Sequence, residues 1–359
     1  MSSPALEAKL PRQARLRSIG PKLALSLLIA AGLVWVLEHG GLPILPPNDK
    51  LARVSLIGLA PYLLLCCLAT YLRTYRWLYL LRPIAPHVSA QRVFGMGLIG
   101  FAAIFFAPLR TGELVRPWLI AEDGEVTFLQ AAGTIAAERV IDGFVLMWLT
   151  LASLLLSQRL TPLPNHVGKL PLPIAAVPAM IYASCAMFSV ALVLMILFYR
   201  WRAPAHRIVH AMLAVVSIRF ADWATMRVER LSDGFKFLPA LRQSGAFLRD
   251  TLFYWLSMIA ATWALLKACG LHANVTQAGV VLGVMGLGSL IPSGPGFFGT
   301  YQLATYCGLA TFFVETLVLG EGAVFTFVSY SVTLLLTVVS FLVGMVLLAR
   351  TKPRAAGAP

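Results

Sequence analysis

Charged residues are scarce in this sequence. Asp, Glu, Lys and Arg make up 12% of its 359 residues, against roughly 25% in soluble domains, whereas 59% of the residues are hydrophobic. A soluble protein of this size cannot hide so much apolar surface, and a disordered chain needs the opposite composition. The apolar runs are long and unbroken, unlike the ~10-residue alternating segments of a membrane β-barrel. The composition therefore predicts an all-α, polytopic helical membrane protein, because helices satisfy their own backbone in lipid.

Cysteine, histidine and acidic residues are also few. The five cysteines lie in apolar runs without a CxxC pair, which argues against disulfides and metal ligation. His206 and His210 stand four residues apart with no third ligand, so neither a metal nor a cofactor is predicted. The 15 acidic and 29 basic residues leave a net charge of +14. In a membrane protein this excess indicates cytoplasmic loops rather than nucleic-acid binding.

About six full membrane spans are predicted from the apolar runs, since each span needs ~20 residues. We expect the first run to be a retained span and not a cleaved signal peptide. The runs are Leu23–Leu37, Val54–Leu72, Phe128 to about Ser157, Leu170–Tyr199, Thr251–Leu266 and Gly322–Ala349.

The basic residues predict the orientation of these spans. Residues 1–22, 73–92 and 200–249 and the C-terminus from Arg350 together hold 21 of the 29 Lys and Arg residues. The positive-inside rule places all four regions in the cytoplasm. We therefore expect a plasma (inner) membrane protein with both termini cytoplasmic. Its parts would be a basic N-terminus (1–22), one transmembrane domain (23–350) and a short tail (351–359).

Two further apolar segments do not fit as single spans. Residue 92 and the start of the span at Phe128 are both expected inside, so segment 93–127 must enter and leave on the cytoplasmic side. By the same reasoning, segment 276–320 enters and leaves on the outside. Each is predicted to be a re-entrant hairpin, with a tight pair of helices as the alternative. The two hairpins would dip into the membrane from opposite faces.

The two hairpins share a short pattern. Pro108 stands four residues before Gly112, and Pro295 stands four residues before Gly299. An offset of 187 residues superimposes the two patterns. Broken hydrophobic segments of opposed topology predict an inverted pseudo-repeat with a transport site near the membrane midplane. The alternative is that Pro and Gly mark two ordinary turns.

Three ionisable residues interrupt the third predicted span. If its helix begins near Phe128, Glu138 lies ~15 Å along it, in the middle of a ~30 Å hydrocarbon core. Glu138 and Asp142 share one face at i,i+4, and Arg139 can reach Asp142 at i,i+3. Charges at this depth cost a few kcal/mol each and are usually functional. We predict a substrate-binding or relay site, the alternative being a self-neutralising network that locks helices together.

The turn of the first hairpin carries a second candidate site. Arg110 and Arg116 flank Gly112 and Glu113. Two guanidinium groups at a broken helix end suit an anionic headgroup, because guanidinium binds phosphate bidentately. Gly112 permits an unusual backbone conformation. The alternative is an ordinary cytoplasmic loop with positive-inside residues.

The turn of the second hairpin is the third candidate site. Gly294, Gly296 and Gly299 would let the backbone approach closely and line a cavity. Pro295, Gly296 and Gly299 would shape the hairpin, and Gln302 follows three residues after Gly299. If the pseudo-repeat holds, this turn faces Arg110 across the midplane. The alternative is a tight extracellular turn.

Residues 203–243 have apolar residues on one face and arginines on the rest, as in a basic amphipathic helix. Such a helix is expected to lie on the anionic inner leaflet or to dock a partner protein.

Three motifs, together with Arg76-Trp77, resemble the transmembrane-region family of lysylphosphatidylglycerol synthases, also called the flippase-like family, over roughly residues 20–350. They are the segments Pro108–Arg116, Glu138–Gly143 and Ile291–Gly299. The resemblance implies a relative of the lipid-translocating half of multiple peptide resistance factors, which flip aminoacylated phosphatidylglycerol. Other members accompany hopanoid or polyprenyl-sugar pathways.

Two departures from the family pattern refine this expectation. The aminoacyl-transferase domain of the full-length synthase does not follow Arg350, so synthase activity is not expected. The family usually has Glu where this sequence has Gln302, which argues against a cationic lipid substrate.

Taken together, the residues and the resemblance predict a non-enzymatic protein that moves an anionic phospholipid or lipid-linked headgroup between leaflets. Arg110, Arg116 and Arg139 would contact the phosphate. A lipid-synthesising enzyme is a possible partner. The alternatives are an intramembrane lipid-modifying enzyme with Glu138 or Asp142 as general base, and a non-transporting partner subunit recruited through residues 203–243.

Overall fold

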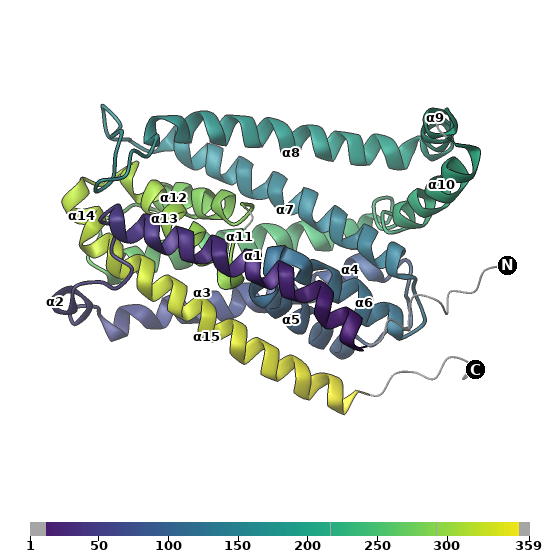
Figure 1. The fold of residues 1–359 in the computed structure, drawn as a ribbon, viewed down its shortest axis with the longest axis horizontal. Helices are drawn as coiled ribbons and strands as arrows, with labels where there is room; N and C mark the ends of the chain where they lie inside the picture. The colour runs from purple at the N-terminus through teal and green to yellow at the C-terminus, as the bar shows by residue number, and fades with distance from the viewer. Residues whose placement is uncertain (1–11, 216, 292, 352–359) are drawn as a thin grey trace.

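The computed structural model describes residues 12–215, 217–291 and 293–351. The predicted N-terminal region up to residue 11, Pro292 of the third motif and the tail from residue 352 lie outside the described residues. The described chain is built of helices joined by short loops, with an isolated β-bridge between Val167 and Leu170 (Figure 1). The all-α prediction is confirmed.

Six long helices make up most of the bundle, and they follow the predicted apolar runs closely. They are α1 (Arg12–His39), α3 (Leu56–Tyr75), α7 (Phe128–Leu156), α8 (Val177–Arg200), α11 (Leu241–Ala268) and α15 (Glu321–Arg350). Short helices join or extend them: α2 (Asn48–Leu51), α4 (Trp77–Leu81), the 3₁₀ turn η3 (Ile174–Ala176) and α14 (Glu315–Leu319).

Five helical stretches are long and apolar enough to cross a membrane, namely Ile57–Leu81, Phe128–Leu156, Ile174–Arg200, Leu241–Ala268 and Glu315–Arg350. The remaining predicted span, Leu23–Leu37, lies within α1, whose described apolar part is the shorter Leu23–His39. The predicted polytopic helical membrane protein is confirmed by this architecture.

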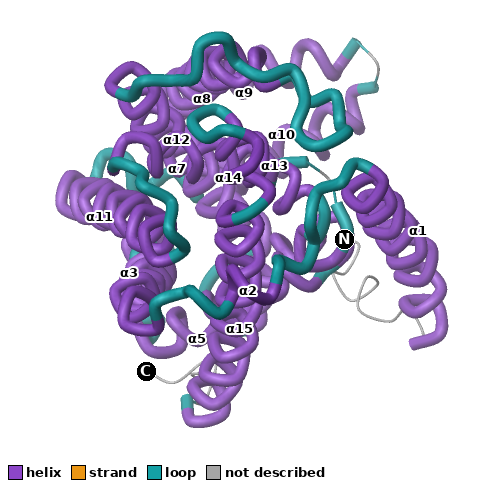
Figure 2. Tube along the Cα trace, turned by 90° about the vertical axis from the view of Figure 1, so that its left-hand side faces the viewer, coloured by secondary structure: helices purple, strands orange, loops and turns teal. Residues whose placement is uncertain are grey.

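The two ends of the bundle differ. α1 begins and α15 ends at the right of Figure 1, where α9 and α10 also lie, whereas α2 and α14 lie at the left. Figure 2 looks onto that left end, where loops connect the helices. At the right end, Arg92 donates hydrogen bonds to Asp123 and to the carbonyl of Thr351, which ties the first hairpin to the end of α15. The basic regions at 73–92 and 200–249 are therefore at the same end of the bundle.

The two predicted hairpin segments are helical hairpins. The first consists of α5 (Ala90–Phe106), the 3₁₀ turn η2 (Pro108–Leu114) and α6 (Val115–Glu122); the second consists of α12 (Val275–Gly288), η4 (Pro295–Phe297) and α13 (Thr300–Ala310). Every arm is shorter than the ~20 residues of a full span. Figure 1 shows the first pair toward the right end of the bundle and the second toward the left.

The turns of the two hairpins meet inside the bundle. The Arg110 guanidinium in η2 donates a hydrogen bond of 2.9 Å to the carbonyl of Ser289, directly after α12. The rings of Phe105 and Phe297 lie edge to face, with their centroids 5.8 Å apart. The charged Arg110 of the first hairpin and aromatic rings from both hairpins therefore lie together in the bundle interior.

The 187-residue offset relates more than the two turns. Arg110 (φ 60°) and Phe297 (φ 54°) are separated by this offset, and both are non-glycine residues with a left-handed backbone. The first hairpin stands between α3 and α7 in the chain, and the second stands between α11 and α15. α5 packs against α15 as α12 packs against α7, and α3 packs along α11.

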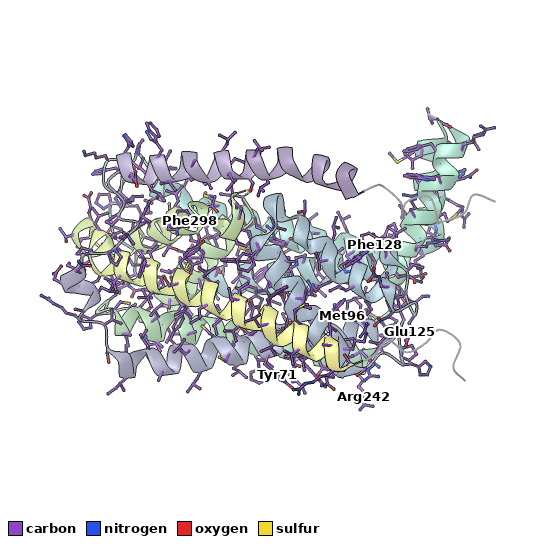
Figure 3. All side chains as sticks on the ribbon, turned by 60° about the horizontal axis from the view of Figure 1, so that its bottom comes forward. Tyr71, Met96, Glu125, Phe128, Arg242 and Phe298 are labelled. Carbon is purple, nitrogen blue, oxygen red and sulfur yellow. The ribbon has the colours of Figure 1, made fainter. Side chains whose placement is uncertain are left out.

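The predicted single amphipathic helix over 203–243 is instead two helices, α9 (Arg202–Ala214) and α10 (Ile218–Asp233), which pack against each other. The first ends at Ala214, and Ser217 begins the second, because its hydroxyl accepts a hydrogen bond from the backbone N–H of Phe220. In Figure 3 this pair stands out from the body of the bundle beyond Phe128.

Asp233 fastens this helix pair to the bundle. Its carboxylate accepts hydrogen bonds from Arg202 (2.8 Å) at the start of α9 and from Gln130 (3.2 Å) in α7, and pairs with Lys236. Burial alone raises the pKa of Asp233, but the hydrogen bonds from Arg202, Lys236 and Gln130 outweigh it and hold that pKa below its ordinary value. The ionised form of Asp233 therefore stabilises the attachment of α9 and α10.

Candidate functional site

Helix α7 carries the central charges of the site. Its first turn is fixed by a capping box between Thr127 and Gln130, so Glu138 follows ~15 Å along the helix. The Glu138 side chain is fully buried and that of Asp142 is 9% exposed. A carboxylate at this depth needs charged partners, because an unpaired ion in a low-dielectric interior is very costly.

Arg76 is the partner of Asp142. It stands at the junction of α3 and α4, and its guanidinium donates to both carboxylate oxygens of Asp142 at 2.6 Å. The same group donates to the hydroxyl of Thr251 in α11 at 2.8 Å and lies 3.6 Å from Glu138. Arg76 is fully buried and thereby joins α3, α7 and α11. Arg76-Trp77 is part of the family resemblance, but Arg76 was not among the predicted site residues.

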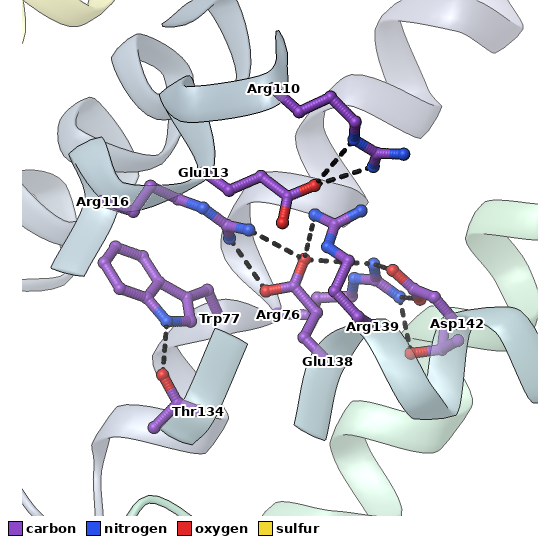
Figure 4. Close-up of polar contacts among 10 residues, drawn as sticks. Arg76, Trp77, Arg110, Glu113, Arg116, Thr134, Glu138, Arg139 and Asp142 are labelled. Atoms are coloured by element: carbon purple, nitrogen blue, oxygen red, sulfur yellow. Dashed lines mark hydrogen bonds and ion pairs between the residues drawn. The ribbon is translucent and has the colours of Figure 1, made fainter. Parts of the chain in front are cut away.

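Arg116 is the closest partner of Glu138. Its guanidinium donates to the two carboxylate oxygens at 2.8 and 3.4 Å and is fully buried. It also lies over the Phe101 ring at 4.3 Å. A Cβ at Gly100 would overlap the Arg116 side chain, so this glycine makes room for Arg116 against α5. Arg116 joins the first hairpin to α7 (Figure 4).

Arg139 pairs with its neighbour Glu138 at 3.4 Å, and not with Asp142 as the i,i+3 spacing predicted. Asp142 is already held by Arg76, which reaches it from α3. The Arg139 side chain is 29% exposed, whereas those of Arg76 and Arg116 are fully buried. Arg139 is thus the least constrained of the three arginines around Glu138.

The turn η2 holds a separate ion pair. Arg110 donates to Glu113 at 2.7 and 3.1 Å, and both side chains are partly exposed. The backbone of Gly112 lies against that of Ala103, where a Cβ would overlap the Ala103 carbonyl. Arg110 in η2 faces the second hairpin, whereas Arg116, in the first turn of α6, faces α7.

A cavity of about 400 Å³ lies beside this cluster, between α3, α5, α7, α11, α12 and α15. Arg110, Arg139 and Asp142 line it, together with Arg73 in α3. Arg73 lies over the Phe101 ring at 3.8 Å, and no hydrogen bond or ion pair within the described residues holds its guanidinium. Arg73 is a site residue that sequence reasoning missed, because a basic residue at the end of an apolar run has the pattern of a cytoplasmic loop.

The charges around the cavity do not cancel. Arg73, Arg76, Arg110, Arg116 and Arg139 face three carboxylates, those of Glu113, Glu138 and Asp142. The cluster therefore has two positive charges in excess, on the cavity side. Arg76, Arg116 and Arg139 pair with the carboxylates of α7, as a self-neutralising network would require, whereas Arg73 pairs with no carboxylate of the described residues.

The second hairpin contributes other residues than predicted to the cavity wall. Ser289, Phe297 and Tyr301 line it, together with residues of α12. The four predicted residues instead shape the turn: Pro295 begins η4, Gly296 (φ 74°) and Gly299 (φ 88°) have left-handed backbones, and the buried Gln302 accepts the Gly299 N–H at 2.7 Å. The side-chain amide of Gln302 therefore caps the N-terminus of α13.

Comparison with known proteins identifies the family. Neither a curated protein nor a solved structure matches the chain. The family model described as the lysylphosphatidylglycerol synthase TM region matches residues 23–339. This range includes both hairpins, α7 and every arginine of the cluster, so the chain is an integral membrane protein of the lysylphosphatidylglycerol synthase TM-region family.

Proposed function

We propose that this protein moves an anionic phospholipid, or a lipid-linked anionic headgroup, between the two leaflets of the membrane. The observation that carries the proposal is the Arg73 guanidinium, which lies on the wall of a cavity inside the bundle and pairs with no carboxylate among the described residues. Arg73 is half-buried, and intramembrane charges usually mark substrate pathways. A bound anion would supply the missing partner.

The chemistry of the cavity wall favours a phosphate. Arg73, Arg110 and Arg139 all reach the cavity, and a guanidinium group can hold two phosphate oxygens at once. The rest of the wall is largely apolar, with hydroxyls from Thr333, Thr337 and others. This combination suits a charged headgroup attached to acyl chains.

The hairpins provide a route through the membrane. We propose that they are re-entrant and form an inverted repeat, which the 187-residue offset and the meeting of Arg110 with Ser289 support. In transporters of this design the substrate binds near the midplane, where broken helices meet, and the two repeats move against each other. The end that carries α9, α10 and both termini is proposed to be cytoplasmic in the plasma membrane, because the basic regions gather there.

An enzymatic role fits the site less well. Glu138 and Asp142, the candidate general bases, both accept hydrogen bonds from buried arginines. A lipid-synthesising enzyme could supply the substrate as a partner, and the projecting α9–α10 pair is the surface we would test for it.

Leaflet exchange in reconstituted vesicles tests the proposal. The purified protein is placed in vesicles with fluorescent phosphatidylglycerol, and dithionite quenches the fluorophores in the outer leaflet. We expect quenching beyond the outer half, compared with protein-free vesicles. The proposal would be contradicted if quenching stops at half of the total fluorescence, both for phosphatidylglycerol and for native lipid extracts. A change in lipid mass in the same vesicles would favour the enzyme.

A further inference from the structure

A second hollow lies on the outside of the bundle. It is a groove of about 680 Å³ between α7, α8 and the α9–α10 pair. We call it the α8 groove. Its lining residues are all hydrophobic, including Ala136 and Val140 of α7, Leu194 and Trp201 of α8, and Leu231 of α10. The ion pairs of the central site contribute nothing to this surface.

The position of the α8 groove exposes it to the bilayer. Both of its long walls, α7 and α8, are candidate membrane spans. Trp201, 59% exposed, stands at its outer end, as an aromatic residue does at a membrane interface. The groove follows α8 from Ala191 to Trp201, or about 15 Å at 1.5 Å per residue. This equals roughly half of the ~30 Å hydrocarbon core, the thickness of one leaflet.

The inner end of the α8 groove adjoins the central cavity. On α7, Arg139 of the cavity wall stands between Ala136 and Val140 of the groove. On α8, Phe188 lines the cavity, and Ala191, less than one turn further, lines the groove. Phe188 packs directly on Gly143, where a Cβ would overlap its ring. The two hollows are therefore neighbours along the seam between α7 and α8, with Phe188 at their boundary.

We propose that the α8 groove binds an acyl chain of the same anionic phospholipid whose phosphate enters the cavity at Arg139. This inference rests on the proposed function and adds to it a second binding site and a point of entry. The groove and a phospholipid are complementary, because an apolar channel about one leaflet long ends beside the Arg139 guanidinium, which is 29% exposed and lies on the cavity wall. A phospholipid has the same order of parts, with apolar chains joined to a phosphate.

Photolabelling tests this inference without relying on transport. The purified protein, in nanodiscs, is irradiated with phosphatidylglycerol or phosphatidylcholine that carries a diazirine on one acyl chain, and labelled peptides are mapped by mass spectrometry. We expect labelling of α8 around Leu194 and of α10 around Leu231, several-fold stronger with phosphatidylglycerol. Arg139→Gln should abolish the preference between the two lipids.

A matched pair of bulky variants provides the control. Ala191→Trp fills the groove and should reduce labelling several-fold. Val190→Trp adds the same bulk at a position that is 57% exposed and outside the groove lining, and should leave labelling unchanged. Both variants are compared by size-exclusion profile, so that a loss of folding is recognised.

The possible outcomes separate the groove from the transport function. Equal labelling by both lipids, or undiminished labelling of Ala191→Trp, would show an ordinary annular lipid and overturn the inference. Labelling that prefers phosphatidylglycerol in a protein that fails to exchange lipid would support the groove and contradict the proposed function. Lipid exchange without groove labelling would support the proposed function and contradict the acyl-chain site in the α8 groove.

Discussion

Substitutions at Glu138 and Arg139 should separate the structural part of the charge cluster from its functional part. Glu138 is fully buried and holds Arg116 at 2.8 Å, with Arg76 at 3.6 Å and Arg139 at 3.4 Å. Glu138→Gln leaves the buried Arg116 without its carboxylate. Breaking a buried ion pair from one side costs about 3–5 kcal/mol, so this variant should lose much of its stability.

Arg139→Ala should have the opposite profile. Arg139 is 29% exposed and lies at the edge of the cluster. When the Arg139 side chain is removed, Glu138 still has Arg116 and Arg76 as partners. A partly exposed ion pair contributes about 1 kcal/mol or less. The variant should therefore insert and fold normally but lose phosphatidylglycerol exchange, because a phosphate ligand is missing from the cavity wall.

The assay compares thermal stability in detergent, read from the monodisperse fraction after heating, with the rate of leaflet exchange in vesicles. Arg53→Ala, at an exposed position remote from the cluster, serves as the control and should change neither. If Arg139→Ala keeps full exchange, the assignment of the cavity as the headgroup site is wrong. If Glu138→Gln is as stable as the parent, the reasoning about the buried network is wrong.

Three more predictions follow from single residues. Arg73→Gln should leave thermal stability nearly unchanged, because this half-buried arginine pairs with no carboxylate of the described residues. It should nevertheless reduce phosphatidylglycerol exchange at least tenfold, and a stable variant with unchanged exchange would refute the role of Arg73. Gly112→Ala should destabilise the first hairpin by about 1–3 kcal/mol through overlap with the Ala103 carbonyl, whereas Gly245→Ala, with open space around it, should not lower the melting temperature. Burial raises the pKa of Asp233, but its hydrogen bonds lower that pKa by more, so the net shift is downward. The stability that Asp233 contributes is therefore fully present above its unfolded-state pKa of about 3.9. It is lost as the pH falls through the lower folded-state pKa. In the parent protein, proteolysis of α9 and α10 should accelerate in that acidic range. In Asp233→Asn it should already be fast at neutral pH. Equal proteolysis rates for the parent and the variant at neutral pH would contradict the proposed role of Asp233 in attaching these helices.

The long helices and the hairpins could be predicted from the sequence because they depend on local properties. A span appears as a run without charge, and the breaks at Pro108 and Pro295 appear as local patterns. The helix from Phe128 to about Ser157 was therefore placed to within one residue of α7. The break between α9 and α10 escaped prediction, since the hydrophobic pattern continues across Ser217 although its side chain caps a new helix.

The choice of partners within the site could not be predicted from local spacing. Arg139 and Asp142 are well spaced on one helix, but Arg76 reaches Asp142 from another helix with two hydrogen bonds. Arg73 and Arg76 were counted among cytoplasmic charges, because nothing in the local sequence distinguishes a loop arginine from one that packing carries into the bundle. The predicted residues of the second hairpin were the conspicuous ones, Pro295 and its glycines, whereas the cavity is lined by side chains around them.

The most direct test of the account is a comparison of two headgroups in one preparation. Vesicles that contain the parent protein and either fluorescent phosphatidylglycerol or fluorescent phosphatidylcholine are treated with dithionite, and the rates of quenching beyond the outer leaflet are compared. A cavity with two positive charges in excess predicts that phosphatidylglycerol crosses at least several-fold faster, and that Arg73→Gln removes the difference. Equal rates for both lipids, or no exchange of either, would contradict the claim that the arginines of this cavity select an anionic lipid for translocation.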